Sequence, residues 1–139
     1  MPIPGLTILA ATFLCGLLGG CVTSGGTTAS EEGAERVAAG KPTFLRQTYM
    51  TMDEHCRPVK RPTGVLTEPP VHGKVRMATK NAKAEYGPGD HQHCDGKLGP
   101  SLAFEYTARP GYRGPDSFGV RVRYNDGEIR QARFKVEVY

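Results

Sequence analysis

The chain has 139 residues, of which 38% are hydrophobic and 23% charged, and its formal net charge at neutral pH is +4. Residues 42–139 are enough for one small globular domain and too few for two. Four cysteines and four histidines are compatible with a disulfide, a metal site or an active site, and the compartment of the protein favours one of these over the others.

The N-terminus contains an uncharged apolar run from Leu6 to Leu18. A membrane-spanning helix takes about 20 apolar residues, so this shorter run is typical of a signal-peptide core. It leads into L-G-G-C, residues 18–21, which resembles the bacterial lipobox, where a signal peptidase cuts before a cysteine that carries lipid. The resemblance implies that residues 1–20 are removed and that Cys21 is lipidated.

One feature departs from that pattern, because residues 1–5 contain no Lys or Arg, whereas a signal peptide usually begins with positive charge. This indicates either an atypical signal or a start codon further upstream. A plain secretory signal and an uncleaved apolar helix stay open as alternatives.

Acylation of Cys21 would place the protein in the bacterial cell envelope, anchored to a membrane because each buried CH2 group contributes about 0.8 kcal/mol. In Gram-negative lipoproteins an Asp after the cysteine resembles a signal for retention at the inner membrane. Val22 stands there instead, which favours the outer membrane, on its periplasmic face or at the cell surface. Nucleic acid is not an expected partner in this compartment.

Residues 21–41 are small, polar and rich in glycine, with too little apolar surface to form a core. They predict a lipidated N-terminus followed by a flexible tether. A short helix over residues 31–39 is the alternative.

Residues 42–139 alternate between apolar and polar side chains with a period of two, which is typical of half-buried strands. In chain order, strands are predicted over residues 44–52, 64–68, 71–77, 102–106, 117–125 and 131–139. Asn125-Asp126-Gly127 is a strong turn signal between the last two strands, which predicts a hairpin. The sequence therefore predicts an all-β fold, an antiparallel β-sandwich of six or seven strands with immunoglobulin-like packing.

Three motifs occur in order: P-P-V-H-G-K-V at 69–75, F-E-Y-T-A-R-P-G-Y-R-G-P-D-S-F at 104–118, and N-D-G at 125–127. Together they resemble the bacterial Ig-like, cadherin-like repeat. The resemblance implies an Ig-like sandwich and suggests a turn role for His72, but it names no ligand. Independently of ancestry, Asp116 at the start of a strand can accept hydrogen bonds from nearby backbone N–H groups.

The cysteines of the domain are expected to pair, because an extracytoplasmic compartment is oxidising. Cys15 would leave with the signal and Cys21 would be acylated, so Cys56 and Cys94 remain. Closing the loop between them would stabilise the fold by roughly 4 kcal/mol on the chain-entropy model.

The alternative is a zinc or copper site built from the two cysteines and from two or three of His55, His91 and His93. The stretch D-H-Q-H-C-D at 90–95 has the required ligand types, and His91 and His93 could bind a metal without either cysteine. Neighbouring residues on a strand point to opposite faces, so His55 and Cys56 would need a turn to share an ion. We therefore expect no metal or other cofactor, with a periplasmic metal-binding protein as the alternative function.

A basic face is predicted on the C-terminal hairpin, opposite its apolar face. It consists of Arg121, Arg123, Arg133 and Lys135. If Val122 faced Ala132, Arg121 would lie opposite Arg133, and like charges in that position destabilise a sheet. The face is therefore a candidate site for an anionic envelope component, with a solvated face that prevents aggregation as the alternative.

No catalytic motif is present: the sequence contains no G-x-S-x-G elbow, no H-E-x-x-H pair and no glycine-rich phosphate loop. We therefore expect no catalytic residue and no enzymatic activity. The expected function is that of a membrane-tethered Ig-like module with a binding or structural role in the cell envelope.

Overall fold

The computed structural model describes residues 33–139. The predicted signal peptide, Cys21 and most of the predicted tether lie outside the described residues. Within this range the chain forms seven strands and one short 3-10 turn, η1: β1 (Glu35–Val37), β2 (Thr43–Phe44), β3 (Thr63–Glu68), β4 (Gly73–Lys83), η1 (Gln92–Cys94), β5 (Leu98–Ala108), β6 (Gly114–Arg123) and β7 (Ile129–Val138). The predicted all-β fold is confirmed. No helix of residues 33–139 is long and apolar enough to cross a membrane.

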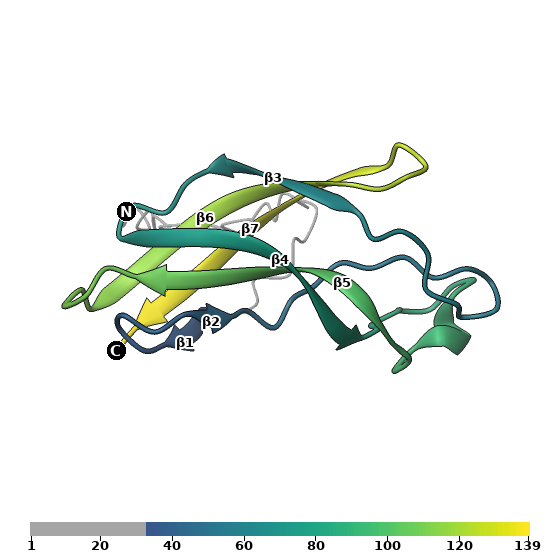
Figure 1. The fold of residues 1–139 in the computed structure, drawn as a ribbon, viewed down its shortest axis with the longest axis horizontal. Helices are drawn as coiled ribbons and strands as arrows, with labels where there is room; N and C mark the ends of the chain where they lie inside the picture. The colour runs from purple at the N-terminus through teal and green to yellow at the C-terminus, as the bar shows by residue number, and fades with distance from the viewer. Residues whose placement is uncertain (1–32) are drawn as a thin grey trace, which may run out of the picture.

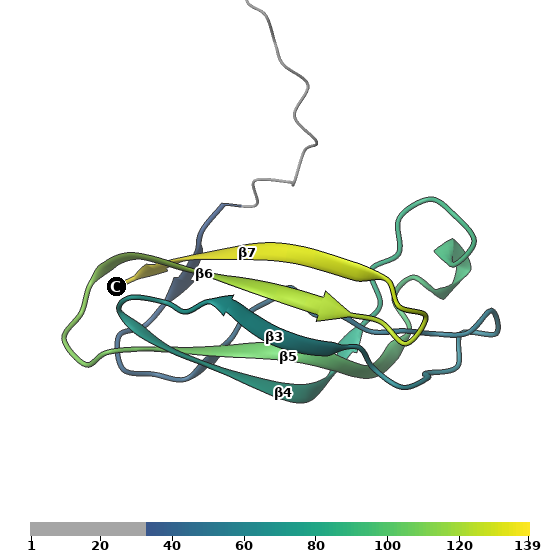
Figure 2. The same ribbon diagram turned by 90° about the horizontal axis from the view of Figure 1, so that it is seen from above.

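The strands form two sheets, one with the order β1-β7-β6-β3 and one with the order β2-β5-β4. All neighbouring strands are antiparallel except β1 and β7, which run parallel. The two sheets lie one above the other as a sandwich (Figures 1 and 2).

The core of the sandwich comes from the inward-facing residues of the strands. Ring centroids of Phe118 and Phe134 lie 4.9 Å apart, and those of Phe104 and Phe134 lie 5.1 Å apart. Because Phe104 belongs to β5, these rings join the two sheets. Each such side chain contributes roughly 1.5–3 kcal/mol through its burial.

The C-terminal hairpin is confirmed, but its predicted register is wrong. Tyr124 N–H donates to Glu128 O at 2.9 Å, and Gly127 adopts a φ of 93°, which favours glycine. The loop is therefore centred on Asp126. The predicted pairing of Val122 with Ala132 would have centred the loop on Gly127, one residue later. Moving the centre by one residue moves each strand partner by two, so Arg121 faces Gln131 rather than Arg133.

The tether prediction is wrong for its last residues. Val37 in β1 is only 1% exposed and pairs with Val138, and Ala39 N–H donates to Tyr139 O at 3.0 Å. This segment is neither flexible nor the alternative helix. Strand β7 would otherwise leave a row of unpaired backbone groups, which β1 satisfies, so the folded domain begins near residue 35 rather than at 42.

Other strand limits also differ from the prediction. The first predicted strand, residues 44–52, is reduced to β2 and two isolated bridges, Tyr49 with Leu102 and Met52 with Pro58. Strands β4 and β5 are longer than predicted, because their eleven residues each pair along their whole length, from Gly73–Ala108 to Lys83–Leu98.

A buried carboxylate links the two sheets at one end of the sandwich. Asp116 is 8% exposed and accepts a hydrogen bond from the hydroxyl of Tyr106 at 2.7 Å. Its oxygens also accept the backbone N–H groups of Val71, His72 and Ser117 at 2.9–3.1 Å. This confirms the role predicted for Asp116. His72 lies in the connection between β3 and β4, in agreement with the suggested turn role. Its backbone N–H is bound by Asp116, and its ring stacks on that of Tyr112 with centroids 3.9 Å apart.

The hydrogen bonds that Asp116 accepts keep its carboxyl ionised by lowering its pKa. Burial by itself would raise the pKa of this carboxyl, but the Tyr106 hydroxyl and the three backbone N–H groups lower it below the ordinary value. A lowered folded-state pKa contributes stability that is present above the unfolded pKa, and this stability is lost as the pH falls through the folded value.

We expect Asp116→Asn to lower the free energy of unfolding at pH 7 by about 2 kcal/mol, because the charge-assisted bonds become neutral ones. The loss of stability of the unmodified protein on acidification should become shallower in this variant. Urea unfolding between about pH 7 and about pH 3 measures both effects. Asp90→Asn, at an exposed site, is the matched control. An unchanged pH slope in Asp116→Asn would contradict this account.

Candidate functional site

A disulfide joins two loops at the other end of the sandwich. Cys56 and Cys94 are bridged, with their Cα atoms 5.1 Å apart, and Cys94 is fully buried. The predicted pairing is confirmed. The bridge ties the loop between β2 and β3 to the loop between β4 and β5.

The Cys56 loop is a tight turn organised by Asp53. The side chain of Asp53 accepts the backbone N–H groups of His55 and Arg57, each at 2.9 Å, and the Arg57 Nε–H at 2.7 Å. These bonds, above all that from the Arg57 backbone, lower the pKa of the carboxyl. Cys56 donates its own N–H to Asp53 O and has a φ of 58°, so the turn positions the sulfur.

The second loop contains the D-H-Q-H-C-D stretch, and it is a turn rather than a strand. Ala84 and Lys97 close its base through a hydrogen bond of 2.8 Å, and Gly96 N–H donates to Ala84 O at 2.8 Å. Within it, Tyr86 N–H donates to the carboxylate of Asp95. Both loops are therefore fixed by local bonds as well as by the disulfide.

Replacing both Cys56 and Cys94 with Ser should lower the free energy of unfolding by up to about 4 kcal/mol, because the disulfide closes a loop with a sequence separation of 38. Urea unfolding of the oxidised protein and of the double variant measures the difference. The intact mass provides the control, since the oxidised protein lacks two hydrogens. Equal stability of the two proteins would show that the bridge has no stabilising role.

The histidines are only partly brought together. The side chain of His55 is 66% exposed, while the rings of His91 and His93 lie 6.5 Å apart. Among residues 33–139, one group of three potential ligands lies within 4.8 Å: Cys56, His93 and Cys94. Its two sulfurs are bonded to each other and thus provide no thiolate. The metal site considered from the sequence is not assembled in this oxidised form.

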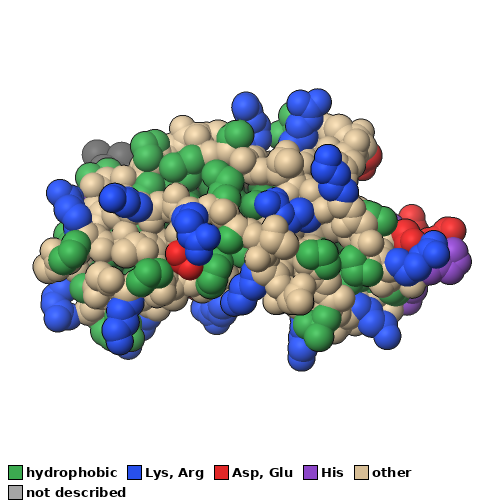
Figure 3. All heavy atoms as spheres, viewed as in Figure 1, with side chains coloured by type: hydrophobic (Ala, Val, Ile, Leu, Met, Phe, Trp, Pro, Cys, Tyr) green, Lys and Arg blue, Asp and Glu red, His purple; other side chains and the backbone are tan. Residues whose placement is uncertain are grey.

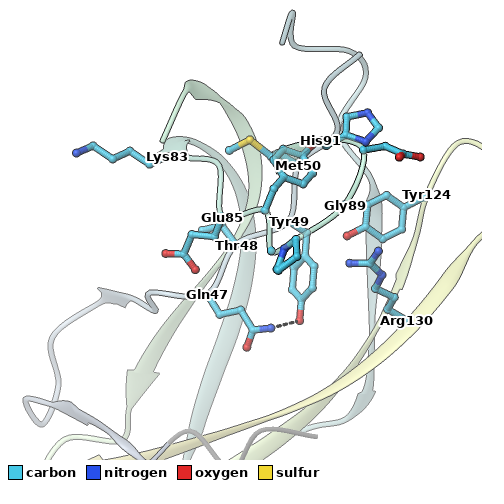
Figure 4. Close-up of a pocket in the computed structure, with 14 residues that line it drawn as sticks. Gln47, Thr48, Tyr49, Met50, Lys83, Glu85, Gly89, His91, Tyr124 and Arg130 are labelled. Atoms are coloured by element: carbon cyan, nitrogen blue, oxygen red, sulfur yellow. Dashed lines mark hydrogen bonds between the residues drawn. The ribbon is translucent and has the colours of Figure 1, made fainter. Parts of the chain in front are cut away.

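A polar cleft of about 460 Å³ lies beside the disulfide loops. It is formed by residues 47–50, by residues 83 and 85–91, and by Tyr124 and Arg130 at the tip of the β6–β7 hairpin (Figure 4). Small-molecule sites typically have volumes of about 300–1,000 Å³. Because the 83–91 wall belongs to the disulfide-bonded loop, the cleft is largely preformed.

Arg130 is the best-placed cation of this cleft. Its Nε–H donates to Glu128 at 2.7 Å, and its guanidinium centre lies 4.8 Å from the ring centroid of Tyr124. The hydrogen bond to Glu128 raises the pKa of Arg130, and burial raises that of Tyr124. The two terminal nitrogens of Arg130 make no hydrogen bond to another described residue, and the guanidinium points toward the cleft (Figure 4).

The opposite side of the cleft is also polar. Gln47 donates its amide to the Tyr49 hydroxyl at 2.8 Å, and Glu85 and Lys83 lie on the same side (Figure 4). Sequence analysis missed this cleft. Its three segments lie far apart along the chain, and no pattern links them.

The predicted basic face is only partly available. Arg133 binds the carboxylate of Glu68, which lies at an irregularity of β3, and also donates to Ser117 Oγ at 3.0 Å. Lys135 also has an interaction partner. Arg121 and Arg123 are exposed, and neither forms an ion pair with any residue from 33 to 139. The four-residue patch is thus reduced to two unpaired arginines.

Cations are spread over the molecule rather than gathered. In Figure 3, Lys and Arg side chains are scattered over the visible face, whereas the histidine side chains in view and several acidic ones gather at the end with the disulfide loops. All 18 Lys and Arg residues lie after residue 32, whereas two of the acidic residues, Glu31 and Glu32, lie before residue 33. The described domain is therefore more basic than the chain as a whole.

Comparison with known proteins identified no relative: no family model, no curated protein and no solved structure matches this chain. Its function is therefore inferred from its own residues.

Proposed function

We propose that the protein is a non-enzymatic binding module of the bacterial cell envelope, held at a membrane by acyl chains on Cys21. The observation that carries this proposal is the preformed polar cleft with Arg130 directed into it. The membrane anchor confines the domain near its target, and the cleft contacts the ligand.

The sandwich is proposed to be Ig-like and cadherin-like. Two antiparallel-rich sheets packed face to face support this, as does the structural use of the motif residues. Asp116, His72 and Tyr106 all belong to stretches that resemble the repeat, and all three meet in one hydrogen-bonded cluster.

A binding role is favoured over catalysis because the raised pKa values of the cleft residues Tyr124 and Arg130 move both groups away from titration near neutral pH. Burial and the hydrogen bond to Asp116 raise the pKa of Tyr106, and hydrogen bonds lower that of Asp116. Both residues lie in the sandwich interior near the start of β6. The cleft lies beyond the other end of β6, next to Tyr124. The perturbed pair therefore serves the fold.

The ligand is proposed to be an anionic envelope component, such as one with the carboxylates of peptidoglycan or the phosphates of lipopolysaccharide. A guanidinium binds carboxylates and phosphates through paired N–H groups. Here Glu128 and the Tyr124 ring hold the guanidinium in place, so little side-chain entropy is lost when an anion binds.

Arg130→Gln should weaken retention of the mature protein on purified peptidoglycan or on immobilised lipopolysaccharide by about 10- to 100-fold, the range for a lost hydrogen bond to a charged group. Co-sedimentation and surface binding assays measure this. Arg113→Gln removes the same charge from an exposed loop position and should leave retention unchanged.

A second variant pair locates the site. If Arg121→Gln combined with Arg123→Gln abolishes retention and Arg130→Gln does not, the ligand binds the outer face of the sheet, as the sequence suggested. If no variant changes retention on either material, the anionic-ligand proposal is wrong.

The anchor has its own test. Cells that produce the protein should incorporate labelled palmitate into it, and Cys21→Ser should abolish the label and release the protein from the membrane fraction, because Cys21 is the proposed acylation site. Cys15→Ser, inside the predicted signal, is the control and should still be labelled. Labelling that persists in Cys21→Ser would contradict the lipoprotein proposal.

A metal-binding function that uses His55, His91 and His93 together is less favoured. His55 lies on the loop of Cys56 with most of its side chain exposed. His91 stacks on Tyr86 with ring centroids 5.3 Å apart. Neither belongs to the group of close potential ligands.

A further inference from the structure

We propose that the disulfide end has a second, reduced state in which Cys56, Cys94 and His93 bind one thiophilic ion, Cu(I) or Zn(II). In the oxidised state the two cysteines hold the loops together covalently. After reduction the same residues would hold them together through the metal. This inference concerns a different site from the Arg130 cleft.

The geometry brings three suitable ligands together. One atom from each residue, two sulfurs and a ring nitrogen, lies within 4.8 Å of the others. Metal–sulfur and metal–nitrogen bonds to zinc are about 2.3 Å and about 2.0 Å long, so a shared ion needs small movements. The cysteine Cα atoms, 5.1 Å apart, already lie on either side of the site.

A backbone carbonyl holds one ring nitrogen of His93. Its Nε2 lies 2.6 Å from the carbonyl oxygen of Glu54. A carbonyl can only accept, so Nε2 must carry the proton, which leaves a lone pair on Nδ1 of the neutral ring. Donation of one ring N–H to a backbone carbonyl is the usual support for a histidine that binds metal through its other nitrogen.

The backbone of Cys56 gives an independent indication. With a φ of 58°, it is the sole non-glycine residue with positive φ among residues 33–139. Such conformations cost of order 1–3 kcal/mol and cluster at functional sites. The hydrogen bonds of Asp53 hold this conformation, and these bonds involve no sulfur atom, so opening the bridge removes none of them.

The site also allows reduction from one side. Cys94 is fully buried, whereas Cys56 is partly exposed. A thiolate of a dithiol reductant attacks Cys56 Sγ, the bond between the two protein sulfurs breaks and Cys94 leaves as a thiolate. The second thiol of the reductant then displaces Cys56, so the reductant becomes a disulfide and two electrons pass to the protein. Ion binding displaces any remaining thiol protons.

The test compares the oxidised and reduced mature protein under nitrogen, after removal of the reductant. Zn(II) and Cu(I) are titrated separately against chromophoric chelators, and native mass spectrometry counts bound ions. We expect one ion per chain in the reduced protein and none in the oxidised protein. The ion with the higher affinity identifies the metal. Bound metal should also raise the melting temperature of the reduced protein toward that of the oxidised one.

Variants locate the ligands. His93→Ala should weaken binding to the reduced protein at least tenfold, whereas His91→Ala, two residues away in the same loop, should change it less than twofold. Circular dichroism of each reduced variant checks its fold. Arg130→Gln should leave metal binding intact, which separates this inference from the proposed function.

Three results would overturn the inference. The first is equal metal binding by the oxidised and reduced proteins. The second is equal loss in His91→Ala and His93→Ala, which indicates an adventitious histidine site. The third is the absence of binding by a reduced protein that is still folded.

Discussion

The buried carboxylate of Asp116 is the interaction on which the arrangement of the sandwich depends. An ionised carboxyl in a protein interior is costly unless its oxygens receive hydrogen bonds. Here the partners come from three places: the β5 side chain of Tyr106, the backbone of the β3–β4 connection, and Ser117 of β6 itself. Satisfying this one group therefore fixes two sheets and a loop relative to one another. A substitution at this end that removes any of these three groups of hydrogen-bond donors would leave the carboxylate partly unsatisfied.

The other end of the sandwich is held differently, by a covalent bond and tight turns. The side chains at this end are therefore not needed to hold the loops in place. The disulfide and Asp53 define the backbone of both loops, so polar residues such as Gln47 and Glu85 can line a cleft instead of filling a core. Arg130 lies at the start of β7, in the four-stranded sheet, and its side chain forms the facing wall of the cleft (Figure 4). The cleft thus lies where a rigid loop meets a rigid hairpin, which is a favourable position for a binding site.

The distribution of charge follows from the sheets. On the outer face of the three-stranded sheet Arg76 is bound to Glu105, and Lys80 lies 4.9 Å above the ring of Phe44. On the other sheet Arg133 is bound to Glu68. Exposed pairs of this kind contribute at most about 1 kcal/mol. The Lys and Arg side chains have a clearer effect on β4, the edge strand of the three-stranded sheet. Charged side chains along an edge strand disfavour its pairing with another chain. The positive charge of the domain is therefore spread over both sheets rather than concentrated in one patch.

The sequence by itself determined the all-β class, the hairpin turn and the disulfide. Alternation with a period of two is local, the turn residues are contiguous, and only Cys56 and Cys94 remain once two cysteines are assigned to the N-terminus. Only the tertiary structure decided the register, because moving the centre of a loop by one residue moves every partner by two. It also decided β1, whose three residues become a strand because β7 leaves an open edge. The cleft likewise required the fold, since its walls come from segments that meet only when the two sheets pack together.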